Sequence, residues 1–115
     1  MTISPPEQDQ APFEDRRAYP RVPVALPAFL QGGDVRHSVQ VIDLSAGGAK
    51  LSCPAPLAAG TAVTLDCGTL NLGAVVRWSG PGTLGVSFDR ELDAREVSAM
   101  ADRSRALQAR MDLAR

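Results

Sequence analysis

The chain has 115 residues, of which 44% are apolar, so it is long enough to form one domain around a single core. Its formal net charge of −1 argues against a general polyanion-binding protein, because such proteins usually carry a large basic excess. Any anion binding must therefore depend on a local cluster of cations.

Residues 1–14 are predicted to form a disordered tail. Pro5, Pro6 and Pro12 stand among polar and acidic residues, and this composition cannot bury enough apolar surface to order itself. The acidic side chains either screen the arginines that follow or belong to a plain solvated terminus, which is the commoner case. The chain shows no secretory signal pattern and no apolar run of about 20 residues, so we expect a cytoplasmic protein without membrane insertion.

A cationic segment follows at residues 15–22 and contains Arg16, Arg17 and Arg21. Guanidinium groups are planar and permanently charged, and their forked donors suit phosphates. Pro20 disfavours helical geometry at Tyr19, so the segment is predicted to be a loop. We expect this loop to become ordered when a bound anion neutralises its charge.

From Val22 onward, short apolar and β-branched segments are separated by Gly, Pro and Asp, which is typical of a β-sandwich or a small β-barrel. In the second segment Val39 and Val41 share one face, and strict alternation would place Asp43 there as well. Tight curvature and bulges disturb such alternation. The expected strands are Val24–Gln31, Ser38–Asp43, Ala49–Cys53, Ala62–Asp66, Asn71–Trp78 and Leu84–Phe88.

After Phe88 the apolar residues follow a helical period, which predicts an amphipathic helix over residues 92–113 with Asp93 as its cap. Packing over the mouth of a barrel is favoured over a coiled coil or a partner-binding helix, because the segment holds fewer than three heptads. The expected apolar stripe is Val97, Met100, Leu107 and Met111, and the expected outer face carries Arg95, Arg103, Arg105 and Arg110.

A second polar motif, Asp43-Leu44-Ser45-Ala46-Gly47-Gly48, ends the second predicted strand. By itself it is an ordinary turn, because Asp and Ser cap backbone groups and Gly tolerates positive φ. Next to the arginines it can also read a nucleobase edge: Arg can donate to paired acceptors of a base, and a carboxylate can accept hydrogens from its N–H groups. Ser45 adds a hydroxyl, and Gly48 leaves room for a base or the backbone to approach.

Arg17-x-x-x-Arg21 followed by Asp43-x-Ser45-x-x-Gly48 resembles, in order and approximate separation, the paired motifs R-x-x-x-R and [D/N]-x-S-x-x-G of the PilZ domain family. Residues 74–78 and 84–88 also look like later strands of that domain. The resemblance runs from about Asp15 to the end of the chain. It implies a mostly β fold: a six-stranded antiparallel split barrel at residues 23–89, between an arginine loop at 15–22 and a C-terminal helix.

The resemblance also implies a ligand, the bacterial second messenger cyclic di-GMP. In the family, Arg17 and Arg21 would contact phosphate and guanine, while Asp43, Ser45 and Gly48 would contact the base from the barrel surface. An arginine directly before the motif, Arg16 here, resembles members that bind an intercalated dimer of the messenger.

Other chemistry-bearing residues favour plainer roles. Trp78 either lines the site or, as the favoured alternative, fills the core, and Tyr19 is expected to pack rather than stack on a base. His37 has no second ligand at metal spacing, so no metal site or cofactor is expected. Cys53 and Cys67 are expected to be free, buried thiols.

The leading prediction is a noncatalytic, monomeric cyclic di-GMP receptor that changes conformation and regulates an unidentified protein effector in trans. An enzyme is not expected, because Ser45 lacks a partnered base and no acid–base pair is evident. One alternative is a PilZ-fold protein-interaction adaptor that binds no nucleotide, against which the intact motifs argue. A barrel that binds single-stranded nucleic acid comes third, because the five aromatic residues are few and the charge is nearly balanced.

Overall fold

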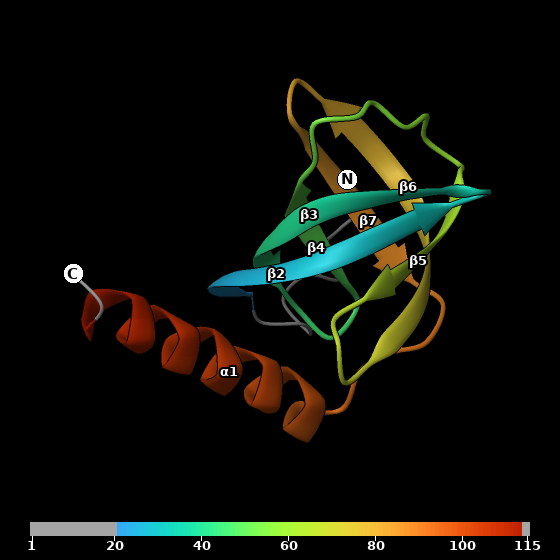
Figure 1. Cartoon of the computed structure of the whole chain (residues 1–115). Coiled ribbons are helices and arrows are strands. Elements are labelled where there is room, and N and C mark those ends of the chain that lie inside the picture. Colours follow the sequence, from blue (N-terminus) through green and yellow to red (C-terminus); the bar gives the residue numbers. More distant parts are fainter. Residues whose placement is uncertain (1–20, 114–115) are drawn as a thin grey trace, which may run out of the picture.

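The structure, a computed structural model, describes residues 21–113. Six antiparallel strands close into a barrel in the order β2-β3-β4-β7-β6-β5, and one helix follows them within the described part of the chain (Figure 1). The predicted mostly β fold, a six-stranded antiparallel barrel with a C-terminal helix, is confirmed. The elements are β2 (Val22–Gly32), β3 (Val35–Leu44), β4 (Gly48–Ser52), β5 (Ala62–Asp66), β6 (Asn71–Gly80), β7 (Thr83–Phe88) and α1 (Ala94–Leu113).

Alternate side chains of each strand fill the inside of the barrel. In β2, for example, Leu26, Ala28 and Leu30 are buried, whereas Pro27 and Phe29 between them face outward. Fully burying a side chain such as leucine contributes about 1.5–3 kcal/mol, so this interior is the main source of stability. Closing the sheet also removes the unpaired strand edges that an open sheet would expose.

Both thiols belong to this interior. Cys53 and Cys67 are free and buried, as the sequence predicted. Burial raises the pKa of the Cys67 thiol to about 11, and the nearby Asp66 carboxylate adds to the shift while Arg103 opposes it. The thiolate is the reactive form, so Cys67 is expected to be chemically inert at neutral pH.

The strict alternation of inward and outward side chains is broken by shifts in strand register. One lies between Val41 and Asp43 of β3, where β3 pairs with β4, and another lies between Val76 and Trp78 of β6. An extra residue in a strand reverses the facing of everything beyond it. Asp43 therefore faces outward, whereas strict alternation would have placed it beside Val39 and Val41. Trp78 also faces outward with 45% of its surface exposed, so the favoured core placement is wrong.

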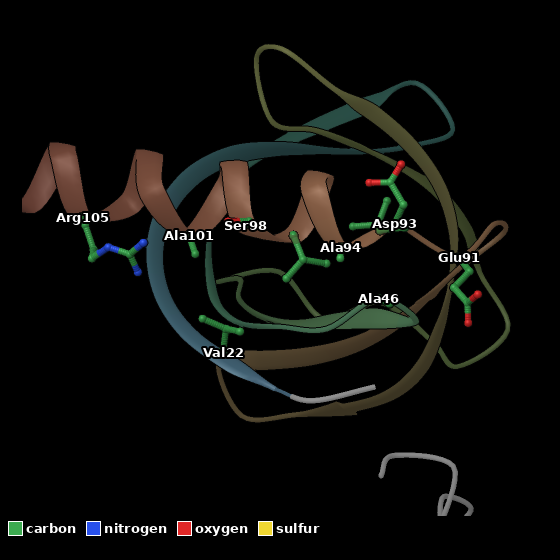
Figure 2. Close-up of a pocket in the computed structure, with 10 residues that line it drawn as sticks. Val22, Ala46, Glu91, Asp93, Ala94, Ser98, Ala101 and Arg105 are labelled. Atoms are coloured by element: carbon green, nitrogen blue, oxygen red, sulfur yellow. The ribbon is translucent and has the colours of Figure 1, made fainter. Parts of the chain in front are cut away.

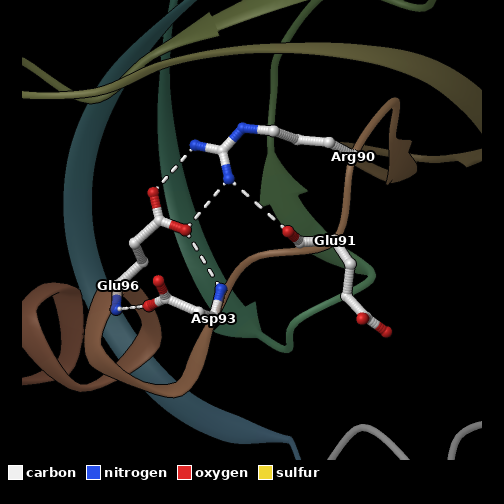
Figure 3. Close-up of polar contacts among 4 residues, drawn as sticks. All are labelled: Arg90, Glu91, Asp93 and Glu96. Atoms are coloured by element: carbon white, nitrogen blue, oxygen red, sulfur yellow. Dashed lines mark hydrogen bonds and ion pairs between the residues drawn. The ribbon is translucent and has the colours of Figure 1, made fainter.

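Helix α1 begins with a reciprocal cap. The Glu96 amide donates to Asp93 Oδ1 at 2.9 Å, and the Asp93 amide donates to Glu96 Oε1 at 3.0 Å, so the expected Asp93 cap is confirmed. Arg90 donates from both Nη atoms to the same carboxylate, at 3.0 and 2.8 Å (Figure 3). These hydrogen bonds, those from Arg90 foremost, lower the pKa of Glu96 to about 2.

Helix α1 packs across one end of the barrel against β2, as expected, and its far end extends beyond the barrel (Figure 1). Met100 is buried, and Val97 and Leu107 pack partly buried against the core. Met111 is 59% exposed, so its predicted place on the buried stripe is wrong, because the barrel does not reach that far. Arg103 is not confined to the outer face either, since it donates to the Cys67 carbonyl at 2.6 Å. Among residues 21–113, no helix has the length and apolar character that crossing a membrane requires.

Candidate functional site

The two sequence motifs meet at an ion pair. Arg21 directly precedes β2, and Asp43 lies near the end of β3, which runs antiparallel to β2 with Pro23 opposite Asp43. This register brings the start of β2 beside the end of β3, and Arg21 Nη1 lies 2.8 Å from Asp43 Oδ2. The Arg21 side chain is 56% exposed and that of Asp43 is 25% exposed. Exposed ion pairs are worth at most about 1 kcal/mol, so an incoming anion or base can replace this one at little cost.

Ser45 follows β3 directly, and Gly48 is the first residue of β4, so the two residues flank the turn between these strands. The Ser45 amide donates to the Gly48 carbonyl at 2.9 Å, and the Ser45 hydroxyl lies 3.3 Å from the same oxygen. A side chain at Gly48 would place its Cβ 2.2 Å from the Val86 carbonyl oxygen of β7. The sequence predicted that either a base or the backbone approaches Gly48 closely. In the structure, the backbone of β7 does so.

The residues paired with Asp43 form a line across the outside of the barrel. In register, Pro23 of β2, Asp43 of β3, Lys50 of β4, Gly85 of β7 and Trp78 of β6 follow one another, and we call them the outer row. Directly opposed residues of an antiparallel pair have Cβ atoms about 4.5–5.5 Å apart. The outer row therefore places a carboxylate, an ammonium group and an indole on one continuous surface.

The Trp78 ring lies over Gly85. A Cβ atom at Gly85 would be 2.0 Å from Trp78 Nε1, so the indole occupies the space that a side chain would need. Gly85 itself is buried although it faces outward, because the ring covers it. The glycine thus lets a large flat ring rest on the barrel wall at the end of the outer row.

Lys50 is a residue that sequence reasoning missed. It is the only lysine of the chain, but its spacing from Asp43 suggested no shared site. The register shift between Val41 and Asp43 is what places Lys50 opposite Asp43. A register shift has no clear sequence signal. The only feature of the sequence that singled out Lys50 was that it is the one lysine of the chain.

Part of the predicted site lies outside the described residues. Arg16, Arg17 and Tyr19 fall there, as do the tail at 1–14 and all but the last two positions of the arginine loop. The described part brings Arg21 and Asp43 into contact, places Ser45 and Gly48 on either side of the next turn, and puts Trp78 in the outer row with Asp43. It holds no group of three or more His, Cys, Asp or Glu side chains that could bind a metal ion.

A groove of about 640 Å³ adjoins the motifs on the side of α1. Val22 and Ala46 form its barrel wall, and Ala94, Ser98 and Ala101 of α1 lie opposite (Figure 2). Val22 follows Arg21 in the chain, and Ala46 follows Ser45. Both halves of the candidate site therefore border the contact between α1 and the barrel.

A comparison with protein families identifies the domain. The model of the PilZ domain matches residues 15–104, which include both motifs, all six strands and the first half of α1. The chain belongs to the PilZ domain family, as its motifs predicted. The search of curated proteins gives no match.

Proposed function

We propose that this protein is a noncatalytic receptor for cyclic di-GMP, and that the contact between Arg21 and Asp43 marks its binding site. The observation that carries the proposal is this 2.8 Å ion pair, because it joins the two motif halves on the barrel surface. Membership of a family of noncatalytic receptor domains supports the ligand class.

The chemistry of guanine fits the two partners. On one edge O6 and N7 accept a forked pair of hydrogen bonds, for which a guanidinium such as that of Arg21 is suited. On the other edge N1 and the 2-amino group donate, for which a carboxylate such as Asp43 is suited. A bound guanine would exchange the exposed ion pair for these two charge-assisted contacts, and the Ser45 hydroxyl would add a third polar contact.

The outer row supplies the rest of a nucleotide surface. The exposed Trp78 ring offers a stacking platform, and stacking of a base on an aromatic ring is worth about 1–3 kcal/mol. Lys50, between Asp43 and Trp78, would face a phosphate. Arg16 and Arg17 would complete the site, Arg17 at phosphate and guanine and Arg16 at a second, intercalated messenger.

The proposed output is a change of conformation at the start of β2 that alters the affinity for a protein effector in trans. The described residues contain one barrel and one helix, and neither is an attached output module. We expect the receptor to act in the cytoplasm as a monomer.

Calorimetric titration of the whole chain with cyclic di-GMP tests the proposal. We expect saturable binding with two messengers per chain, and weaker binding as salt screens the phosphate contacts. Arg21→Ala should weaken binding about 5- to 150-fold, the range for losing a bidentate base contact. Cyclic di-AMP is the matched control, because adenine lacks both O6 and the N1 hydrogen. A wild-type chain that does not bind cyclic di-GMP would overturn the proposal in favour of an interaction adaptor, and one messenger per chain would overturn the dimer.

A further inference from the structure

Ser104 of α1 is buried where the helical period would place an apolar residue. It stands between Met100 and Leu107 on the face that packs against the barrel, and it is only 6% exposed. Its hydroxyl accepts a hydrogen bond from the Ala25 amide at 2.8 Å and donates one to the Ala25 carbonyl at 3.3 Å. One side chain of the helix thus satisfies both backbone groups of one residue of β2.

Ala25 lies in an irregular part of β2. The register of β2 with β3 shifts between Pro23 and Leu26, so Val24 and Ala25 fall at an irregularity and have no one-to-one partner in β3. Backbone groups removed from water without a hydrogen-bond partner are costly, and the Ser104 hydroxyl is a partner for both groups of the half-buried Ala25. The helix therefore fixes the path of β2 at the point where this strand leaves its regular pairing.

This point is next to the candidate site. Two residues before Ala25 stands Pro23, which is opposite Asp43, and two residues further back stands Arg21. The second motif half is tied to the same helix, because the Leu92 amide, just before α1, donates to the Ala46 carbonyl at 2.8 Å. Both halves of the site are thus bonded to α1 or to its leading residues.

We propose that Ser104 is a positioning residue for the nucleotide site and acts through Ala25 on Arg21. The inference rests on the proposed cyclic di-GMP function. Ser104 touches no ligand; it holds the start of β2 so that Arg21 stands against Asp43. Coupling between two sites is reciprocal, so a ligand held by Arg21 also stabilises the contact between Ser104 and Ala25.

A neighbouring residue gives a matched control. Arg103 also bonds α1 to the barrel backbone, through the Cys67 carbonyl after β5, and this contact involves neither motif half. Losing either bond should loosen the helix to a similar degree. Only the loss of the hydrogen bonds between Ser104 and Ala25 should also change the position of Arg21.

The test is calorimetry with cyclic di-GMP on the wild-type chain, Ser104→Ala and Arg103→Met, at about 150 mM salt so that distant charge is screened. Ser104→Ala should weaken binding about 3- to 30-fold, the range seen for residues that modulate a site without touching the ligand. Arg103→Met should stay within about twofold of the wild type, below that range. Amide hydrogen exchange at Ala25 provides a second measurement, and saturating ligand should slow it in the wild type.

The outcomes separate the two proposals. No binding by the wild type would overturn the receptor function itself. Wild-type binding with an unchanged Ser104→Ala, or with equal losses in both variants, would overturn the positioning role alone. An Ala25 amide whose exchange is unaffected by ligand would also overturn it, because a purely structural anchor predicts that result.

Discussion

Arg21 Nη1 and Asp43 Oδ2 lie 2.8 Å apart although 22 positions separate the two residues in the sequence. The antiparallel pairing of β2 and β3 produces this contact, since Pro23 is opposite Asp43. Arg21, directly before β2, and Asp43, near the end of β3, therefore lie on the same part of the barrel surface. Of the other motif positions, Gly48 shapes this surface, and Ser45 would contact a ligand.

Gly48 is expected to be needed for folding rather than for binding alone. Gly48→Ala would force a Cβ to within 2.2 Å of the Val86 carbonyl oxygen, and backbone cannot yield as a flexible side chain can. We expect a loss of about 1–3 kcal/mol in the free energy of unfolding, measured by urea denaturation. Gly32→Ala is the control, because its nearest neighbour lies at 3.5 Å, an ordinary contact. Equal stability of the two variants would contradict this role.

Gly85 is expected to govern the position of Trp78. Gly85→Ala must displace the indole, because its Cβ would fall 2.0 Å from Trp78 Nε1. Trp78 is the only tryptophan, so tryptophan fluorescence, excited at a wavelength that tyrosine does not absorb, reports on it alone. We expect a shifted emission maximum in this variant, quenching by cyclic di-GMP in the wild type, and weaker quenching in Gly85→Ala.

The control for that measurement is Gly80→Ala, whose nearest neighbour is Thr83 Oγ1 at 3.6 Å. It should leave the emission maximum and the quenching unchanged. Fluorescence that does not respond to ligand in a wild-type chain that binds would remove Trp78 from the proposed site.

The Glu96 carboxylate is expected to make the helix cap sensitive to acid. Its pKa is lowered to about 2, so it binds its proton less readily folded than unfolded, where about 4.3 is usual. A lowered pKa contributes stability that is complete above the unfolded value and is lost as pH falls through the folded value. The melting temperature should therefore fall between about pH 5 and pH 2, and Glu96→Gln should flatten that dependence.

Glu91→Gln is the control, because the Glu91 side chain points away from Arg90 and only its backbone carbonyl accepts a hydrogen bond (Figure 3). The acid sensitivity of this variant should match that of the wild type. A Glu96→Gln chain with an unaltered pH profile would show that the cap carries no such charge effect.

Periodicity and turn residues are local signals, so they predicted the strands and the helix but left a sandwich and a barrel open; the family resemblance implied the six-stranded barrel. All six strands and the helix are present, and Asp93 caps the helix as predicted. Alternation failed at Asp43, where a register shift turns the side chain outward. The core placement of Trp78, which rested on the usual burial of tryptophan, failed beside a second register shift. Such shifts depend on how strands curve to close a barrel, which local sequence does not encode.

The same limit applies to the candidate site. The motif spacing identified Arg21, Asp43, Ser45 and Gly48, but it could not show that a backbone carbonyl occupies the space beside Gly48. Lys50 and Ser104 were missed because their relation to the site passes through strand register and helix docking. The positions of both residues relative to the site depend on the three-dimensional structure of the closed barrel.

The most direct test of the account is the affinity for cyclic di-GMP of two matched variants, Asp43→Asn and Asp66→Asn. Both aspartates pair with an arginine on the barrel surface, Asp43 with Arg21 at 2.8 Å and Asp66 with Arg36 at 3.2 Å, but Asp66 is not part of either motif. The account predicts a loss of about 5- to 150-fold for Asp43→Asn, because asparagine cannot offer two acceptors to guanine, and an affinity near that of the wild type for Asp66→Asn. Wild-type affinity in Asp43→Asn, or equal losses in both variants, would contradict it.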